Sequence, residues 1–119
     1  MKMRPNEFID GVYQAVYRTA INGVMKIVKQ PPGRRPRADL TALSEWFNAL
    51  DEIGQERVHE LVRLSVDQAV FGVLATIDGA RALPGGADVR LIEGENDLGA
   101  ERNLHDLFRS RVDHELGYD

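Results

Sequence analysis

Apolar residues recur every three or four positions between Asn6 and Lys29, which is the spacing of one helix face. Pro5 suits the approach to the first turn of this helix, and the Asn6 side chain can cap it. The segment that follows, Lys29–Arg37 (KQPPGRRPR), contains three prolines and a glycine. Because the residue before each proline is pushed out of the helical region, we expect an extended connection here.

The same spacing returns from Leu40 to Leu50, and either Asp39 or Thr41 can cap this second helix. Its two aromatic residues, Trp46 and Phe47, are predicted to lie in the core.

A third helix is predicted between Asp51, its cap, and Gly79, its terminator. Its first half is amphipathic, whereas its second half contains the nearly uninterrupted apolar run Ala69–Ile77. A rod of this length is longer than the expected width of the domain. We therefore expect that it protrudes, that Gly72 kinks it, or that a second chain covers part of it.

The segment after the third helix contains the clearest indication of β structure. Residues 87–93 alternate imperfectly between apolar and polar, which predicts a short strand or half of a hairpin, and residues 93–99 (EGENDLG) predict an acidic turn. Asn103 and Asp106 resemble a capping pair for a last helix, and Gly117 ends it. The overall prediction is a single domain over residues 1–119, mainly α: an antiparallel four-helix bundle with a small β element between helices three and four.

Composition and charge narrow the possible environments. The chain has 119 residues and no cysteine, which excludes disulfides, thiolate metal sites and cysteine nucleophiles. Its start lacks the apolar core of a signal peptide, and the longest apolar run is too short to span a membrane. We therefore expect a cytoplasmic protein that does not cross a membrane.

The net charge of −4 conceals an uneven distribution. Residues 1–37 carry eight Lys and Arg against two acids, whereas the remainder carries seven Arg against seventeen acids. Such a chain can present surfaces of opposite sign to partners, unless the fold interleaves the two halves.

Positive charge is densest in residues 26–37, which include Arg34, Arg35 and Arg37. This segment can serve as a solvated loop, contact an acidic protein partner, or bind the phosphates of nucleic acid. The aromatic residues that stack on single strands are missing from it, which disfavours nucleic acid.

His59, Arg63 and Asp67 are successive i, i+4 neighbours on the third helix. One interpretation is a catalytic or ligand-binding strip with His59 as general base and Arg63 as an anion contact. The simpler interpretation, which we favour, is an Arg63–Asp67 ion pair beside an exposed histidine.

Asp67 and Asp78 each border a strongly apolar run, where an unpaired carboxylate is costly. We predict that both are buried structural acids rather than catalytic ones. The expected partner of Asp78 is Arg81, Arg90 or the backbone amides of the following turn.

Metal and cofactor chemistry finds no support in the sequence. His105 and His114 are nine residues apart, so one helix points them in opposite directions. The chain also lacks HExxH, a phosphate-binding glycine loop and a nucleophile elbow. We therefore predict no metal and no cofactor.

The phrases PPGRRP, LSEWFNAL, SVDQAVFGVLATIDGARAL and NLHDLF resemble a group of small uncharacterised bacterial proteins over about residues 31 to 108. The resemblance implies a bacterial cytosolic domain, and it implies no catalytic residues because the group has no established activity. In size and charge alone, the chain is also similar to immunity proteins that neutralise toxins.

These observations favour a non-catalytic, acidic protein-binding module, and one form of such a module is an immunity-like or antitoxin-like inhibitor of a basic partner. The predicted partner-binding residues are the acids and arginines of two segments: Asp88, Glu93, Glu95, Asp97, Arg34, Arg35 and Arg37. One alternative is a small enzyme or ligand-binding protein that uses the His59 strip, and another is nucleic-acid binding through residues 26–37. A homodimer is compatible with all three.

Overall fold

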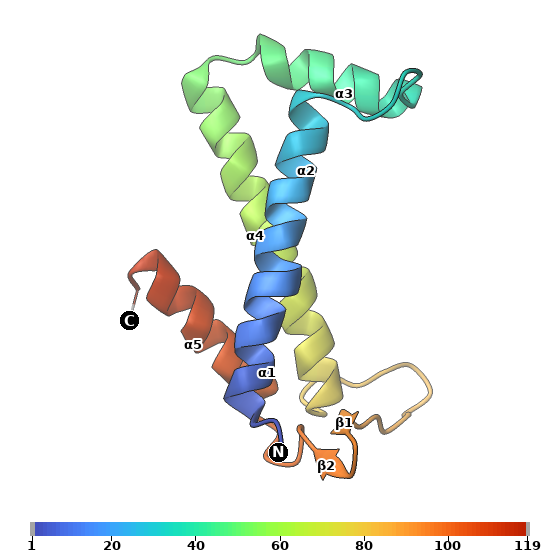
Figure 1. Ribbon diagram of the computed structural model, residues 1–119, viewed down its shortest axis with the longest axis vertical. Coiled ribbons are helices and arrows are strands. Elements are labelled where there is room, and N and C mark those ends of the chain that lie inside the picture. Colours follow the sequence, from blue (N-terminus) through green and yellow to red (C-terminus); the bar gives the residue numbers. More distant parts are fainter. Residues whose placement is uncertain (1, 119) are drawn as a thin grey trace. The chain divides into compact units, whose positions relative to one another are not determined.

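The computed structural model describes residues 2–118 and is mainly helical, with one two-stranded antiparallel sheet (Figure 1). In chain order, its elements are α1 (Pro5–Val12), the π-helical segment η1 (Tyr13–Arg18), α2 (Thr19–Lys29), α3 (Ala38–Ala49), α4 (Glu52–Ile77), β1 (Ile92–Glu93), β2 (Asn96–Asp97) and α5 (Leu104–Leu116). The prediction of a mainly helical chain with a small β element before its last helix is confirmed.

The chain divides into two compact units, which we describe separately. Unit 1 consists of Met1–Tyr17 and Gln68–Asp119, and unit 2 consists of Arg18–Asp67. The chain passes between the units within η1 and within α4 and not at a loop. The loops that the sequence predicts therefore do not indicate this division.

Helix α1 of unit 1 begins at Pro5, whose fixed φ and missing N–H suit the first helical position. The Glu7 carboxylate accepts hydrogen bonds from the backbone N–H of Arg4 at 3.1 Å and from its Nε at 2.9 Å. The hydrogen bond from the Arg4 side chain lowers the pKa of Glu7. Arg4 therefore occupies the capping position, and the prediction that Asn6 caps this helix is wrong.

Two tyrosines of η1 form part of the core of unit 1. Tyr13 and Tyr17 are buried and stack with ring centroids 5.2 Å apart. The edge of the Phe108 ring meets Tyr17 at 5.7 Å, and the guanidinium of Arg111 lies 4.2 Å from the centre of the Tyr13 ring. A π-helical turn places an extra residue in the helix, so the 3.6-residue period alone does not predict it.

Helices α1 and α5 lie side by side in unit 1 (Figure 1). The Arg111 Nε donates to Asp10 Oδ1 of α1 at 3.0 Å, and its Nη1 donates to Glu115 one turn along α5. The hydrogen bond to Glu115 and then the one to Asp10 raise the pKa of Arg111, so this guanidinium stays charged at the helix contact.

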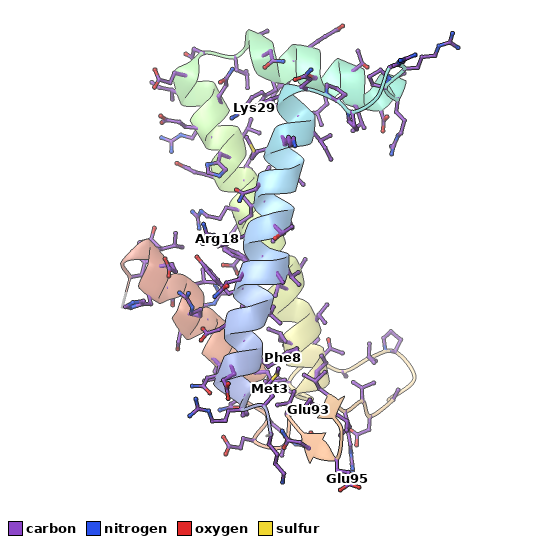
Figure 2. The ribbon with its side chains drawn as sticks, viewed as in Figure 1. Met3, Phe8, Arg18, Lys29, Glu93 and Glu95 are labelled. Carbon is purple, nitrogen blue, oxygen red and sulfur yellow. The ribbon has the colours of Figure 1, made fainter. Side chains whose placement is uncertain are left out.

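Strands β1 and β2 form a hairpin in which Glu93 pairs with Asn96. Gly94 opens the two-residue turn with a φ of 61°, a conformation that glycine adopts without strain. The hairpin holds the N-terminal segment (Figure 2), because Glu93 Oε1 accepts the Met3 N–H at 2.9 Å and Asn96 Nδ2 donates to the Met3 carbonyl at 2.8 Å.

Helices α2 and α3 pack together in unit 2. Ser44 Oγ and Asn48 Nδ2 both donate to the carbonyl of Lys29, at 3.2 and 3.1 Å, so α3 satisfies an acceptor at the C-terminal end of α2. Phe47 is 1% exposed, as predicted for a core residue, whereas Trp46 is 53% exposed. The prediction that Trp46 lies in the core is wrong, because adjacent residues are 100° apart on a helix and α3 turns Phe47 inward.

Asp51 caps α4 as predicted, since its Oδ1 accepts the Gly54 N–H at 2.7 Å. We expect Asp51→Ala to lower the free energy of unfolding of unit 2 by about 1 kcal/mol, because one helix N–H loses its acceptor. Urea unfolding followed by the emission of Trp46, which lies in the same unit, measures this. Asp51→Asn retains a capping oxygen and should stay close to the wild type; an equal loss in both variants would contradict the capping role.

Candidate functional site

A groove of about 650 Å³ lies within unit 2, between α2 and the first half of α4. Phe47 and Met25 supply apolar surface to it. Charged and polar side chains line the remainder, with cations on α2 and acids and a histidine on α4: Lys26, Lys29, Glu52, Glu56 and His59. Lys29 lies at the α2 end nearest α3 (Figure 2). A cavity of this size, with apolar surface and a few polar groups, is typical of a binding site.

The predicted His59 strip contributes one residue to this groove. His59 lines it and is exposed, Arg63 is partly exposed outside its lining, and Asp67 is 4% exposed. A catalytic strip requires its side chains to converge on one concave surface, and only His59 of the three meets this groove.

The positive residues of the segment 26–37 do not form one cluster but lie in three different environments. Lys26 and Lys29 line the groove, and Arg37 donates to Asp39 of the first turn of α3 at 2.5 and 3.1 Å. That hydrogen bond lowers the pKa of Asp39. Arg34 and Arg35 remain exposed on the connection between the helices. The segment therefore offers fewer cations to one ligand than its sequence suggests.

Asp78, one of the two predicted structural acids, lies at the end of α4 in unit 1 with a fully buried side chain. Its Oδ2 accepts the backbone N–H of His105 at 2.8 Å and lies 2.5 Å from the His105 Nδ1. Neither of the predicted arginines, Arg81 and Arg90, nor the backbone of the following turn is the partner: the backbone N–H and the ring of His105 are. The two donors belong to the start of α5, which lies far from Asp78 in the sequence. The residues around Asp78 therefore do not predict them.

The carboxylate of Asp78 also caps α5, because His105 is the second residue of that helix. Asn103 holds the capping position, yet its side chain makes no capping hydrogen bond, which corrects the predicted Asn103–Asp106 pair. An acid near a helix N-terminus is favourable, since the helix dipole is positive there. Asp78 thus joins the end of one helix to the start of another within unit 1.

The His105 ring has the arrangement of an oriented histidine, with its Nδ1 on a buried carboxylate. Phe71 meets the ring edge-on at 5.5 Å, and Nε2 lies 3.6 Å from Asp106 Oδ1. A cavity of about 230 Å³ borders Asp78, and His105 is not among its lining residues. The geometry at His105 therefore supports an anchoring role rather than proton transfer to a bound substrate.

The four acids predicted to contact a partner belong to unit 1 and differ in their contacts. Asp88, Glu93 and Glu95 are exposed, and Asp97 is half-buried. Glu93 binds the Met3 N–H, and Asp97 Oδ1 accepts the Gly99 N–H at 3.0 Å. Asp88 and Glu95 make no hydrogen bond or ion pair within residues 2–118, so they are the acids available to a cationic surface.

Among the described residues, no cluster of three or more His, Cys, Asp or Glu side chains is arranged to hold a metal ion. No helix within residues 2–118 is both long and apolar enough to cross a membrane.

Comparison with known proteins yields no match: no family model, no curated protein and no solved structure corresponds to this chain.

Proposed function

We propose that this chain is a non-catalytic module that binds a protein partner through the helices of unit 2. The observation that carries the proposal is a set of exposed apolar side chains that occur in adjacent pairs on three helices. The pairs are Val24 and Ile27 on α2, Leu43 and Trp46 on α3, and Leu61 and Leu64 on α4, with exposed fractions between 37% and 62%.

Residues three apart on a helix are surface neighbours, so each pair exposes a continuous apolar area. Single exposed apolar residues are ordinary, whereas grouped ones mark interaction surfaces. Trp46 is the expected centre of the contact because tryptophan is enriched among the residues that dominate binding energy. The groove beside these helices adds cations and acids that can fix the orientation of a partner.

The acidic surface of unit 1 suggests the chemistry of the partner. Asp88 and Glu95 carry exposed charges without ion pairs in the described part of the chain, which favours a basic protein and an immunity-like inhibitory role. Catalysis through the His59 strip receives less support, because only His59 lines the groove. Nucleic-acid binding receives less support because the cations of residues 26–37 are divided. We also propose that the helices form an antiparallel four-helix bundle and that the protein is cytoplasmic.

Site-specific photo-crosslinking in the source cell tests the proposal. A photoreactive phenylalanine analogue at Trp46 or Leu61 should give one dominant protein adduct, and the same analogue at Ser110, an exposed position on α5 of unit 1, should not. An adduct that also forms in the purified protein would identify a second copy of the chain as the partner. Absence of an adduct at both apolar positions would overturn the proposal.

Once the adduct identifies the partner, Trp46→Ala should weaken its binding by at least about thirtyfold, as expected for a residue worth about 2 kcal/mol. Glu45→Ala on the same helix is the matched control and should leave the affinity within about twofold of the wild type. Because Trp46 is the sole tryptophan, a blue shift of its emission on binding reports its burial directly. Equal affinities of the two variants would remove Trp46 from the interface.

A further inference from the structure

The first half of α4, which belongs to unit 2, is a helix whose apolar side chains lie open to solvent. Residues 52–66 are all exposed or half-buried. Ile53 is 65% exposed and Leu64 is 52% exposed. An amphipathic helix of a globular protein ordinarily buries its apolar side against a neighbour. This part of α4 therefore offers a surface that another protein can cover.

Four exposed residues of this stretch follow one line along the helix, which we call the α4 stripe: Ile53, Arg57, Glu60 and Leu64. With 3.6 residues per turn, the directions of these four residues fall within about 60° of one another. The spacing between them is four, three and four residues. Alternation of three and four is the spacing by which two helices pack along a shared seam.

The two charged residues form an ion pair at the middle of the α4 stripe. Arg57 Nη1 donates to both carboxylate oxygens of Glu60, at 3.2 and 3.0 Å. Both side chains are more than half exposed, and an exposed pair of this kind adds little to stability. A guanidinium has five N–H donors, so Arg57 can bind a second carboxylate while it retains Glu60.

The α4 stripe is complementary to a reversed copy of itself. When a second copy of the helix runs antiparallel, Leu64 of the partner subunit lies opposite Ile53, and Glu60 of the partner subunit lies opposite Arg57. Because the spacing is the same in both directions, one register makes the apolar and the charged contacts together. Such self-complementarity is what the interface of a two-fold symmetric dimer requires.

We propose that two copies of this chain form a symmetric dimer through antiparallel α4 stripes. Arg57 and Glu60 of both copies then form one network of four charges between two apolar pairs. Charges fix the register and the choice of partner in packed helices, and the apolar pairs add affinity. The inference rests on the proposed function and deepens it, because it names a second copy as the protein that covers α4. Trp46 on α3 remains open to a different protein.

A second copy fits the α4 stripe better than a basic protein does. A basic surface would meet Arg57 at the middle of the stripe, and like charges in contact are unfavourable. The stripe is roughly 17 Å long, at 1.5 Å per residue. This contact is smaller than a standard interface, which buries about 800 Å² on each partner. We therefore expect a reversible dimer rather than a permanent one.

Sedimentation equilibrium of the purified full chain tests the proposal. We expect a monomer and a dimer in equilibrium, with a Kd below about 100 μM. A larger Kd, or a mass of one chain throughout, would overturn the dimer. The sample contains no other protein, so this failure would leave the proposed function untouched. Photo-crosslinking at Trp46 in the source cell reports on that function separately.

Charge reversal tests the register of the two stripes. Arg57→Glu places four acids at the centre of the dimer, and Glu60→Arg places four arginines there. Each variant alone should dimerise at least about tenfold more weakly than the wild type. An equimolar mixture of the two should dimerise about as tightly as the wild type, because each copy then supplies the charges that the other lacks. Recovery in the mixture also shows that both variants are folded.

Glu45→Arg is the matched control for Glu60→Arg, because it makes the same change of charge at an exposed position on α3. It should retain the Kd of the wild type, which excludes an effect of net charge. A mixture that stays as weak as its two components would contradict the antiparallel register. Single variants that dimerise like the wild type would remove the α4 stripe from the interface.

Discussion

Phe108→Ala is expected to lower the free energy of unfolding of unit 1 by about 3 to 5 kcal/mol, the usual cost of removing a buried phenylalanine ring. Phe108 is 0% exposed, and its ring meets Tyr17 edge-on with an interplanar angle of 75°. The substitution leaves a cavity between α5 and the tyrosines of η1, and it also removes an aromatic contact beyond the buried area.

Urea unfolding followed by circular dichroism measures this loss, with Ser110→Ala, an exposed position on the same helix, as the control. Trp46 emission recorded in the same titration reports unit 2 alone. A loss below about 1 kcal/mol in Phe108→Ala would mean that the α5 side chains collapse into the space or that this packing is not maintained in solution.

The helices of this chain are predictable from sequence because their apolar spacing and their caps are local. Asp51, which caps α4, and Gly117, which ends α5 with a φ of 78°, act on their own chain neighbours. The β element is predicted only roughly: the pattern predicts a strand over residues 87–93 and a turn over residues 93–99, whereas the strands are Ile92–Glu93 and Asn96–Asp97 on either side of a turn that Gly94 opens.

The error at Trp46 in α3 and the unpredicted π-helical turn η1 have a different origin. The spacing of apolar residues gives the faces of a helix but not which neighbour covers each face. Trp46 therefore looks like a core residue by type, although Phe47 and Ser44 face α2 instead. Likewise, a π-helical turn that stacks Tyr13 on Tyr17 leaves no signature in a pattern analysed with a period of 3.6.

The candidate sites depend still more on contacts between distant residues. The sequence indicates that Asp78 requires a partner, because an unpaired carboxylate beside an apolar run is costly. It does not identify His105, which lies 27 residues away and becomes a donor only after α5 has formed. The groove containing His59 and Phe47 arises in the same manner, from helices that meet only in the folded unit.

Asp78→Ala is expected to cost unit 1 about 3 to 6 kcal/mol, since hydrogen bonds to charged groups contribute about 1.5 to 3 kcal/mol each and this carboxylate accepts two. The substitution leaves the His105 N–H and its ring without their acceptor at the start of α5. It also removes the negative charge that favours this helix N-terminus. Chemical unfolding measures the total, and amide hydrogen exchange at His105 and Asp106 shows whether the first turn of α5 opens.

Two further variants distinguish whether α5 is capped by Asp78, which is distant in sequence, or by Asn103, which directly precedes the helix. Asp78→Asn keeps an acceptor oxygen without the charge, so we expect it to lose less stability than Asp78→Ala. Asn103→Ala changes the residue at the capping position itself, whose side chain makes no capping hydrogen bond, and should cost less than about 1 kcal/mol. If Asn103→Ala destabilised α5 as much as Asp78→Ala, the local asparagine would be the true cap. Asp78 would then be a buried acid held in place mainly by its histidine.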